Sequence, residues 1–360
     1  MNFFKNIFKT NKQTNKTSSS GKDEKSSFMP KIETPTDNRF VQNFIKNGGK
    51  FLYSENENEV NKNLALIIEE NSWKKSSLFS LDKEISKRFK LDYSFSKNSK
   101  DETTCLISTC EYLIADDGST QETTDVIKRF QKESSLRIKH VWQEDDGFQK
   151  TKILNKAILA SEGDYLIFSD GDCIARKDFV FKHLKYRRPK HFLSGGYYKL
   201  SQSISDAVSK ENIVSQSCFD AAWLLENGQP KNFKINKLTS HGTKEVMLNT
   251  FTTTTPTWDG NNASGWREDI LAVNGFDSRM QYGGEDRELG ERLTNYGVQG
   301  IQIRYSAVAV HLEHARGYVT QDMIEKNKTI RAHTRKQNIV WTPYGIDPKE
   351  VAGDSKSVIG

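Results

Sequence analysis

The chain has 360 residues, 53 of them Lys or Arg and 47 Asp or Glu, and its formal net charge is +6. This length allows one large or two ordinary domains, because single cores stop growing at about 250–300 residues. The positive charge suits an anionic partner. However, the basic residues are scattered among acids and carry no zinc-finger, basic-zipper or RNA-recognition pattern, so we expect no nucleic-acid partner.

Residues 1–37 are rich in Lys, Ser, Thr and Asn and poor in apolar residues, which predicts a disordered basic arm. Its first dozen residues could form a short basic amphipathic turn on an anionic membrane, or simply be a frayed terminus. Their apolar run is too short for a signal peptide or a membrane span. The four cysteines have no metal-ligand or disulfide-like spacing. We therefore expect a cytoplasmic protein with reduced thiols, at most peripheral to the inner membrane surface.

Residues 38–110 contain no catalytic constellation. The run NGGKFLY at 47–53 indicates a turn into a strand, residues 59–70 an amphipathic helix, and residues 105–109 a second apolar run. We treat this stretch as a partial N-terminal region that is separate from the rest of the chain.

From residue 111 onward, strand-like and helix-like runs alternate, which predicts an α/β sheet with helices on its faces. We expect strands at 111–116, 136–142, 165–169, 192–200 and 300–310, and helices at 122–132, 150–160, 204–212, 267–274 and 285–296. The Gly-, Asn- and Thr-rich stretch 250–264 is predicted to be a long loop, either a substrate lid or disordered. Residues 346–360 are taken as a tail.

Asp170-Gly171-Asp172 directly follows the apolar run at 165–169. Two carboxylates at the exit of a strand can hold Mg²⁺ or Mn²⁺, whose open coordination positions accept phosphate oxygens. Asp-x-Asp alone more often caps a turn. Here, two more motifs follow it in order, Gly283-Gly284-Glu285-Asp286 and His311-Leu312-Glu313-His314. Together they predict a metal site with Asp170 and Asp172 as ligands, completed by His311 or, less favourably, by His314.

Two adjacent acids provide candidates for a general base. Asp286 would accept a proton from an acceptor hydroxyl, with Glu285 beside it. Acids also favour the first turn of a helix for dipole reasons alone, but the two preceding glycines permit close approach of a ligand.

Further residues could bind a donor or an acceptor. Asp116 and Asp117 end the first strand and could hold a base or ribose, or could form a capped turn. Asp145 and Lys152 lie near the same strand exits as Asp170. Gly265-Trp266 could stack on a sugar, although a Trp beside a helix is ordinarily part of the core.

From residue 111 to 341 the chain resembles the family-2 glycosyltransferases of the GT-A fold, of the bacterial kind that builds capsular polysaccharide or lipopolysaccharide. The resemblance lies in these pieces, in the family's order: LIADDGST, EDDGFQKTKILNKAI, GDYLIFSDGDCIARKDF, NNASGWREDILAVNGFD, YGGEDRELGERL and VAVHLEH.

The resemblance implies an inverting, metal-dependent transfer of a hexose or N-acetylhexosamine from a UDP-sugar to a glycan or lipid-linked acceptor. It implies that Asp117 contacts uridine and that Asp170 and Asp172 bind Mn²⁺ or Mg²⁺ with help from His311. It also implies that Asp286 is the base and that Glu285 helps to bind the acceptor.

The front of the chain departs from this pattern. Family members begin with a strand ending in a Pro-Thr-Tyr-Asn-like turn and then a helix, whereas here Leu106-Ile107-Ser108-Thr109 runs almost directly into Glu111. Residues 29–119 resemble instead the start of a lactate-utilisation (LUD) domain protein, which suggests a fusion or chimera. Two other functions follow as alternatives: a disabled domain that binds nucleotide or glycan without turnover, and a metal-dependent phosphohydrolase.

Overall fold

The computed structural model describes residues 56–70, 78–80, 87, 105–107, 111–134, 136–315, 317–346 and 358–359. The chain divides into two compact units, and every described residue belongs to the second of them, Leu52–Gly360. The predicted basic arm, the turn and strand at 47–53 and most of the tail lie outside the described residues. Helix α2 (Glu57–Glu70) confirms the helix expected at 59–70, and the short strands β1 (Leu78–Ser80) and β2 (Cys105–Ile107) pair in parallel.

The first part of the α/β region has the elements that the sequence predicts. In chain order they are β3 (Glu111–Asp117), α4 (Gln121–Glu133), β4 (Arg137–Gln143), α5 (Lys150–Ala160) and β5 (Tyr165–Phe168). Strands β3 and β4 are parallel, and α5 packs on both of them. Asp117 ends β3 and Asp170 follows β5, so both acids emerge from carboxyl ends of strands.

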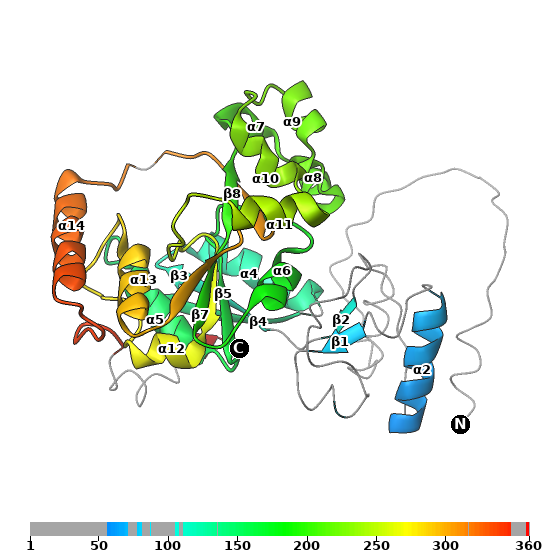
Figure 1. Ribbon diagram of the computed structural model, residues 1–360, viewed down its shortest axis with the longest axis horizontal. Helices are drawn as coiled ribbons and strands as arrows, with labels where there is room; N and C mark the ends of the chain where they lie inside the picture. Colours follow the sequence, from blue (N-terminus) through cyan, green and yellow to red (C-terminus); the bar gives the residue numbers. More distant parts are fainter. Residues whose placement is uncertain are drawn as a thin grey trace, which may run out of the picture. The chain divides into compact units, whose positions relative to one another are not determined.

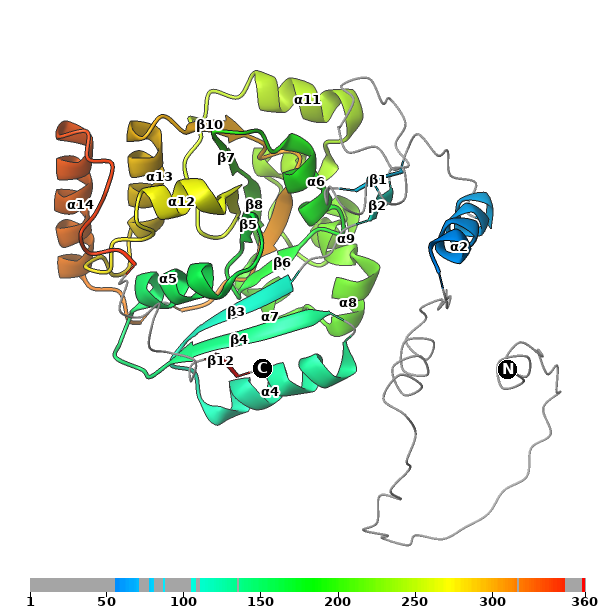
Figure 2. The same ribbon diagram turned by 90° about the horizontal axis from the view of Figure 1, so that it is seen from below.

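The second part is more divided than expected. Its elements are β6 (Cys173–Ala175), α6 (Phe179–Tyr186), β7 (His191–Ser194), β8 (Gly196–Lys199), α7 (Gln202–Ala207), α8 (Lys210–Ser215), η3 (Ser217–Phe219), α9 (Ala221–Glu226), η4 (Phe233–Ile235), α10 (Asn236–Thr239), α11 (Gly242–Thr250), β9 (Ala263–Trp266), α12 (Arg267–Ala272), α13 (Glu285–Asn295), β10 (Gln299–Gln302), β11 (Val308–His311), α14 (Gln321–Lys336) and β12 (Val358–Ile359). Figures 1 and 2 show these helices around the strands.

The main strands form three sheets in the described chain, with strand orders β10-β7-β9-β5, β6-β11-β8 and β12-β4-β3. Parallel and antiparallel pairs are mixed: β7 is parallel to β10 and antiparallel to β9. This confirms the expected α/β class, a mixed sheet arrangement with helices on its faces (Figure 1).

Two of the predicted strands are each divided into two strands in the structure, so the prediction of a single strand was wrong in both places. Residues 192–200 form β7 and β8, and residues 300–310 form β10 and β11, with the members of each pair in different sheets. A Cβ on Gly195 would overlap the Asn262 side chain, and one on Gly196 would overlap the Arg304 carbonyl. The chain changes sheets where only glycine permits these close approaches.

The helix predicted at 204–212 is also divided, into α7 and α8. Ser209 caps α8 because its hydroxyl accepts a hydrogen bond from the Asn212 amide, while the Asn212 side chain accepts one from the Ser209 amide. This capping box starts a new helix inside the predicted one.

The predicted loop at 250–264 is anchored by its own side chains. Trp258 is fully buried and packs at 5.4 Å from Phe168 and 5.8 Å from Phe192, between ring centroids. The last two residues of the predicted loop, 263 and 264, belong to β9. None of the helices in the described ranges combines the length and the apolar character needed to cross a membrane.

Candidate active site

A cavity of about 2180 Å³ opens at the carboxyl ends of β3 and β5 and extends along both strands. It brings together most of the site residues that the sequence predicts, and its lining includes Asp117, Asp170, Asp172, Glu285, Asp286 and His311. These residues come from β3, from the turn after β5, from the start of α13 and from the end of β11.

Asp172 lies between two histidines because β6 and β11 pair antiparallel, with His311 opposite Cys173. Asp172 Oδ2 is 2.8 Å from His314 Nε2 and 3.4 Å from His311 Nε2. The two imidazole rings are nearly parallel, with their centroids 6.2 Å apart. The less favoured histidine, His314, is therefore the closer of the two to Asp172.

The side chains around Asp172 fit a divalent cation. Asp172, Cys173 and His311 each offer one ligand atom, and these atoms lie within 4.8 Å of one another. Burial and the charge of Asp172 raise the pKa of the Cys173 thiol, so it stays protonated at neutral pH and is a poor ligand. The remaining carboxylate and imidazole donors suit Mn²⁺. They suit Mg²⁺ less well, because Mg²⁺ prefers oxygen ligands to imidazole nitrogen.

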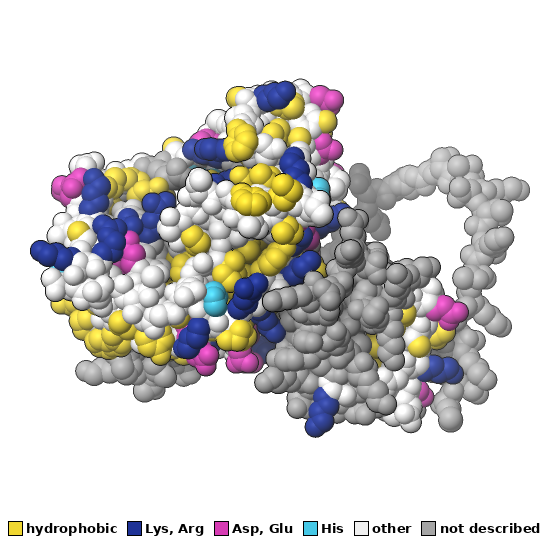
Figure 3. Space-filling model, viewed as in Figure 1, with side chains coloured by type: hydrophobic (Ala, Val, Ile, Leu, Met, Phe, Trp, Pro, Cys, Tyr) yellow, Lys and Arg dark blue, Asp and Glu magenta, His cyan; other side chains and the backbone are white. Residues whose placement is uncertain are grey.

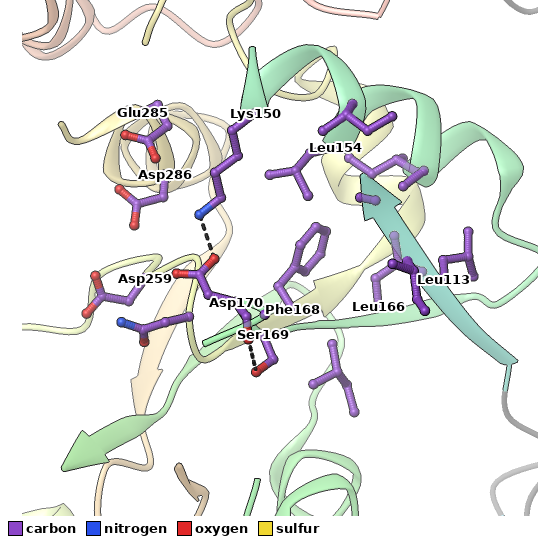
Figure 4. Close-up of a pocket in the computed structure, with 18 of the residues that line it drawn as sticks. Leu113, Lys150, Leu154, Leu166, Phe168, Ser169, Asp170, Asp259, Glu285 and Asp286 are labelled. Atoms are coloured by element: carbon purple, nitrogen blue, oxygen red, sulfur yellow. Dashed lines mark hydrogen bonds and ion pairs between the residues drawn. The ribbon is translucent and has the colours of Figure 1, made fainter. Parts of the chain in front are cut away.

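Asp170 is not part of this cluster, although the sequence predicts it as a second ligand. Its Oδ1 atom is 2.6 Å from Lys150 Nζ at the start of α5. Figure 4 shows Lys150 reaching toward Asp170 beside the acids of α13. Burial opposes the charge of Lys150, but attraction to Asp170, Glu285 and Asp286 outweighs it and raises the Lys150 pKa. Lys150 therefore stays fully charged.

The acids at the start of α13 are held by backbone amides. Asp286 accepts hydrogen bonds from the amides of Gly260, at 2.9 Å, and Arg287, at 2.7 Å. Glu285 accepts one from Gly283 at 2.9 Å. Burial, and then repulsion from Asp286, raises the pKa of Glu285. Gly284 precedes the helix at φ 91°, a conformation that favours glycine.

Asp259 joins this group from the loop before β9, and the sequence analysis did not select it. Burial, and then repulsion from Asp286, raises the pKa of Asp259. Figure 4 shows its carboxyl group on the same side of the cavity as Glu285 and Asp286. Asp259, Glu285 and Asp286 thus bring three carboxyl groups to one side of the cavity. A lone Asp before a Gly-Asn-Asn run gives little signal in the sequence.

The two adjacent acids of β3 have different environments. Asp117 lines the cavity, held by the Gln143 side chain at 2.5 Å and the Gln149 amide at 2.8 Å. Asp116 is only 4% exposed and bonds to Ser119 and His140. Burial alone would raise its pKa, but these hydrogen bonds outweigh it and lower the pKa. Asp116 matches the capped-turn alternative.

The structure does not bring the other predicted binding residues to the acidic cluster. The side chains of Asp145 and Lys152 are exposed, and neither is among the lining residues of the cavity. Gly265 packs against the Trp258 ring. Trp266 pairs with Tyr165 at the amino end of β5, whereas Asp170 follows its carboxyl end, because β5 and β9 are antiparallel. The Trp266 indole donates to the Arg188 carbonyl at 2.7 Å.

Three aromatic rings from different loops form a cluster in the cavity wall that the sequence analysis missed. Phe148 stacks on Tyr318 with centroids 5.5 Å apart, and Tyr282 meets Phe148 at 5.8 Å and Tyr318 at 5.7 Å. All three line the cavity. No spacing in the sequence could have joined them, because each precedes a different helix.

Basic side chains border the same cavity. Its lining includes Arg287 at the start of α13 and Lys328 and Arg331 of α14. Figure 3 shows Lys and Arg side chains, with a few acids, over α13 and α14 at the left. A basic border beside an acidic centre suits an anionic ligand bound together with a cation.

The site thus combines a mixed α/β arrangement, whose strand exits carry Asp117 and the Asp-Gly-Asp turn, with an acidic helix start that lines the same cavity. Residues 103–239 match the family Glycosyl transferase family 2. The match runs from just before β2 to the end of α10 and supports a family-2 glycosyltransferase.

Curated relatives agree with this class. The chain is 27% identical over 241 residues to the uncharacterized glycosyltransferase YfnE of Bacillus subtilis, covering 60% of each chain. It is 26% identical to a validoxylamine A glucosyltransferase of Streptomyces hygroscopicus, over 62% of this chain and 53% of the relative. Chondroitin synthase of Escherichia coli is 23% identical over 67% of this chain and 35% of its own length. The chain thus spans less than two thirds of the length of each of these relatives, from 60% down to 35%.

Solved structures resemble the chain more distantly. The mannosyltransferase PcManGT of Pyrobaculum calidifontis, with GDP-Man and Mn²⁺, has a TM-score of 0.38 at 18% identity and covers 59% of this chain and 49% of its own. Residues 1–349 of TarS from S. aureus, with UDP-GlcNAc, give 0.40 at 14% identity and cover 64% and 61%. Likenesses this weak have no bearing on the site.

Proposed function

We propose that the protein is a metal-dependent glycosyltransferase. It would move a hexose or N-acetylhexosamine from a UDP-sugar to a glycan or lipid-linked acceptor with inversion, in the cytoplasm and, for a lipid-linked acceptor, at the membrane surface. One observation carries the proposal: three groups of side chains line one cavity. They are the Asp172–histidine cluster, and the Lys150–Asp170 pair with the acidic start of α13 (Figure 4).

The leaving diphosphate needs positive charge. The residues that would hold Mn²⁺ or Mg²⁺ are Asp172 and His311, and His314 lies close enough to Asp172 to take part. Such an ion would stabilise the negative charge that develops on the diphosphate. Lys150 would add a second, fixed positive charge beside Asp170. Asp117, fixed by Gln143 and Gln149, is our candidate for contact with the uridine.

The acceptor hydroxyl needs a base. Asp286 is our candidate, because two backbone amides fix its carboxylate and still leave lone pairs for the hydroxyl proton. Glu285 would hold the acceptor beside it. The rings of Phe148, Tyr282 and Tyr318 offer a surface on which the apolar face of a sugar could stack.

Two variants of the full chain test the proposal. We expect Asp172→Asn to lose the Mn²⁺-dependent thermal shift with UDP, and Asp286→Asn to keep that shift but lose sugar transfer by about 10²-fold or more. UDP release from a panel of UDP-sugars measures turnover. Asp125→Asn on the exposed face of α4 is the control and should match the wild type. Full activity in either cavity variant would remove that residue from its assigned role.

A second candidate function is binding of nucleotide or glycan without turnover. The observation that favours it is the interrupted sheet: β3 and β5 both line the cavity, yet they belong to different sheets. A metal-dependent UDP shift without transfer from any donor in the panel would identify this function.

A further inference from the structure

Helix α11 turns a polar face toward the protein. Its buried residue is Glu245, whose carboxylate accepts hydrogen bonds from Lys182 Nζ at 2.7 and 2.8 Å and another from the Ser306 hydroxyl. About one turn further on, the Asn249 side chain donates to the same Ser306 hydroxyl at 2.7 Å. The helix is therefore anchored to the fold through polar contacts.

The opposite face of α11 carries apolar side chains. Met247 and Phe251 follow Glu245 and Asn249 by two residues, roughly half a turn, and they are 58% and 76% exposed. Val246 is exposed beside them. A surface helix ordinarily directs its apolar side at the core. In α11 the arrangement is reversed, and the described residues do not cover its apolar face.

Phe233 of η4 adjoins this face and is 74% exposed. The Asn236 side chain connects the two, because it donates to the Phe233 carbonyl at 3.0 Å and accepts from Lys244 Nζ at 3.2 Å. Figure 3 shows hydrophobic side chains gathered over α11, with Lys and Arg side chains beside them. The name α11 patch is used below for the side chains of Phe233, Val246, Met247 and Phe251.

The exposed charges around the α11 patch are positive. Residues 229–257, all of them described, contain a single acid, Glu245, which is buried and paired with Lys182. The same stretch holds four lysines, of which Lys231, Lys234 and Lys244 are exposed. The surface of this stretch thus combines apolar side chains with positive charge and no exposed carboxylate.

The rest of the chain has poor charge complementarity to this surface. Most residues outside the described part lie in 1–55 and 71–104. The first range has ten Lys or Arg against five Asp or Glu, and the second has eight against five. Repulsion between like charges disfavours these segments as a cover for the patch. The same argument favours an anionic partner that is not part of the chain.

The type of basic residue favours a lipid surface over a protein. All the exposed basic side chains of 229–257 named above are Lys, which is depleted in protein–protein interfaces, whereas Arg is enriched there. Segments that lie on bilayers combine Lys with Phe and aliphatic residues. A Lys stem can rest on apolar surface while its ammonium group reaches the lipid headgroups.

We propose that the α11 patch docks the protein on a membrane surface that contains anionic lipids. Its apolar side chains would enter the boundary between headgroups and acyl chains, and the lysines would lie at the lipid phosphates. Docking itself does not depend on the proposed function. On that function, which this one consequence presupposes, docking would hold the cavity near a lipid-linked acceptor, because the loop after α11 carries Asp259 to the cavity.

The first test mixes the full chain with phosphatidylcholine vesicles, either pure or with about one third phosphatidylglycerol. We expect binding at least about tenfold tighter to the anionic vesicles, weakened by salt, and slower amide hydrogen exchange at residues 233–251 on them. Equal binding to both kinds of vesicle would overturn the proposal. So would binding that slows exchange only elsewhere, for example in the basic stretch 1–37.

Apolar variants give a second readout. The double variant Met247→Ser with Phe251→Ser should bind anionic vesicles about tenfold more weakly or less, because it removes apolar surface from the contact. Phe130→Ser on α4 is the matched control, since Phe130 is 48% exposed and Figure 2 shows α4 and α11 on opposite sides of the described fold. Unchanged binding in the double variant would contradict the proposal.

Lysine variants test the electrostatic part. Lys234→Gln with Lys244→Gln should weaken binding to anionic vesicles about tenfold or more and leave binding to pure phosphatidylcholine nearly unchanged. Lys128→Gln with Lys132→Gln on α4 makes the same change in net charge at exposed positions and is the control. Equal losses in the two pairs would show that net charge, and not the α11 patch, governs binding.

Exchange without vesicles tests the other possible covers. Slow exchange at residues 243–251 at every protein concentration would mean that the chain itself covers the patch. Slow exchange that grows with protein concentration, together with dimer formation in sedimentation, would mean that a second copy does. Either outcome would overturn the proposal.

The docking proposal and the proposed function fail separately. Vesicle binding through the α11 patch by a protein that transfers no sugar would support docking and contradict only the proposed function. Conversely, the variant with Met247→Ser and Phe251→Ser should keep the Mn²⁺-dependent thermal shift with UDP, because neither residue lines the cavity.

Discussion

At the scale of single residues, Asp172 contacts the segment after β11 through both its side chain and its backbone. Its Oδ2 atom faces both His311 and His314, and its backbone carbonyl accepts a hydrogen bond from the Leu312 amide at 2.9 Å. The segment that follows β11 is thus fixed to the turn after β5 by backbone and side chain alike. A cation at Asp172 would meet ligands that are already positioned, which reduces the cost of ordering them.

Lys150 gives the first prediction at this scale. We expect Lys150→Met to lower kcat by about 10²-fold with a smaller change in KM, since its charge acts on negative charge that develops during departure of the diphosphate. Lys150→Arg should recover part of the loss. Steady-state kinetics with the best UDP-sugar measures both effects.

Lys152→Met is the matched control for Lys150, because Lys152 lies on the same helix with an exposed side chain. It should leave both kinetic constants unchanged. Equal losses in the two variants would show that Lys150 has no special role.

Glu285 gives a prediction about pH. Burial and Asp286 raise its pKa above the ordinary 4.5, so the folded state keeps a proton that the unfolded state has released, and the free energy of unfolding falls as pH rises through this window. Glu285→Gln cannot release a proton in this window, so the variant does not lose this part of the free energy of unfolding. Without metal, we expect the variant to melt above the wild type at pH 8, by about 2–4 °C for each kcal/mol regained, and the difference to vanish below pH 4.5.

The same Glu285→Gln protein should transfer sugar poorly, since the carboxylate is our acceptor contact. A variant that is less stable than the wild type at pH 8 would show that attraction to Lys150 outweighs burial and repulsion from Asp286.

At the scale of elements, strand pairing decides which predicted residues meet. The acids after β3 and β5 could be expected together because parallel strands end at one edge of a sheet. The meeting of His311 with Asp172 depends on the β6–β11 register, which no local pattern encodes. The antiparallel register of β5 and β9 likewise places Trp266 at the wrong end of β5 for the role that the sequence suggested.

The division of the long predicted strands was partly visible in the sequence. Gly195 and Gly196 interrupt an apolar run, and Arg304 to Ser306 interrupt another, so a break was open to prediction at both places. Assignment of the two halves to different sheets was not, because it depends on what packs against each glycine in the folded chain.

Gly196 provides the prediction at this scale. We expect Gly196→Ala to lower the free energy of unfolding by about 1–3 kcal/mol, because its Cβ would overlap the backbone of Arg304, which cannot move aside cheaply. Urea denaturation followed by circular dichroism measures the change.

Gly163→Ala is the control for Gly196. A Cβ there would lie 3.7 Å from its nearest neighbours, an ordinary contact, so the change should cost little. If Gly196→Ala were as stable as this control, the close approach between β8 and Arg304 would not be required by the fold.

At the scale of the whole molecule, buried polar side chains hold the parts together. His183 of α6 is fully buried, with Nδ1 2.7 Å from Ser264 Oγ and Nε2 2.9 Å from Asn262 Oδ1. Asn262 in turn donates to the carbonyls of Gly196 and Ala307. This network joins α6, β8, β9 and the start of β11, which belong to two of the sheets.

His183 also predicts how the molecule responds to acid. Burial lowers its pKa from 6.5 to about 4, so between these values the unfolded state binds a proton that the folded state does not. The free energy of unfolding should therefore fall as pH drops from 6.5, by up to about 3 kcal/mol near pH 4 from this residue alone. Urea melts at pH 7 and pH 4.5 measure the loss.

His183→Gln keeps some hydrogen bonding but cannot titrate, and it should be less stable at pH 7 while losing less on acidification. An unchanged pH dependence in this variant would assign the acid sensitivity to other groups.

The separation of the metal-site residues along the chain has a consequence for synthesis. Asp172 and His314 are 142 positions apart. At about 5–20 residues per second, the ribosome needs roughly 7–28 s to add the intervening stretch. During that interval the nascent protein presents its Asp-Gly-Asp turn without the two histidines that lie beside Asp172 in the folded chain. If the proposed function holds, capture of a metal ion would therefore be a late event, restricted to a chain whose two distant segments have already come together.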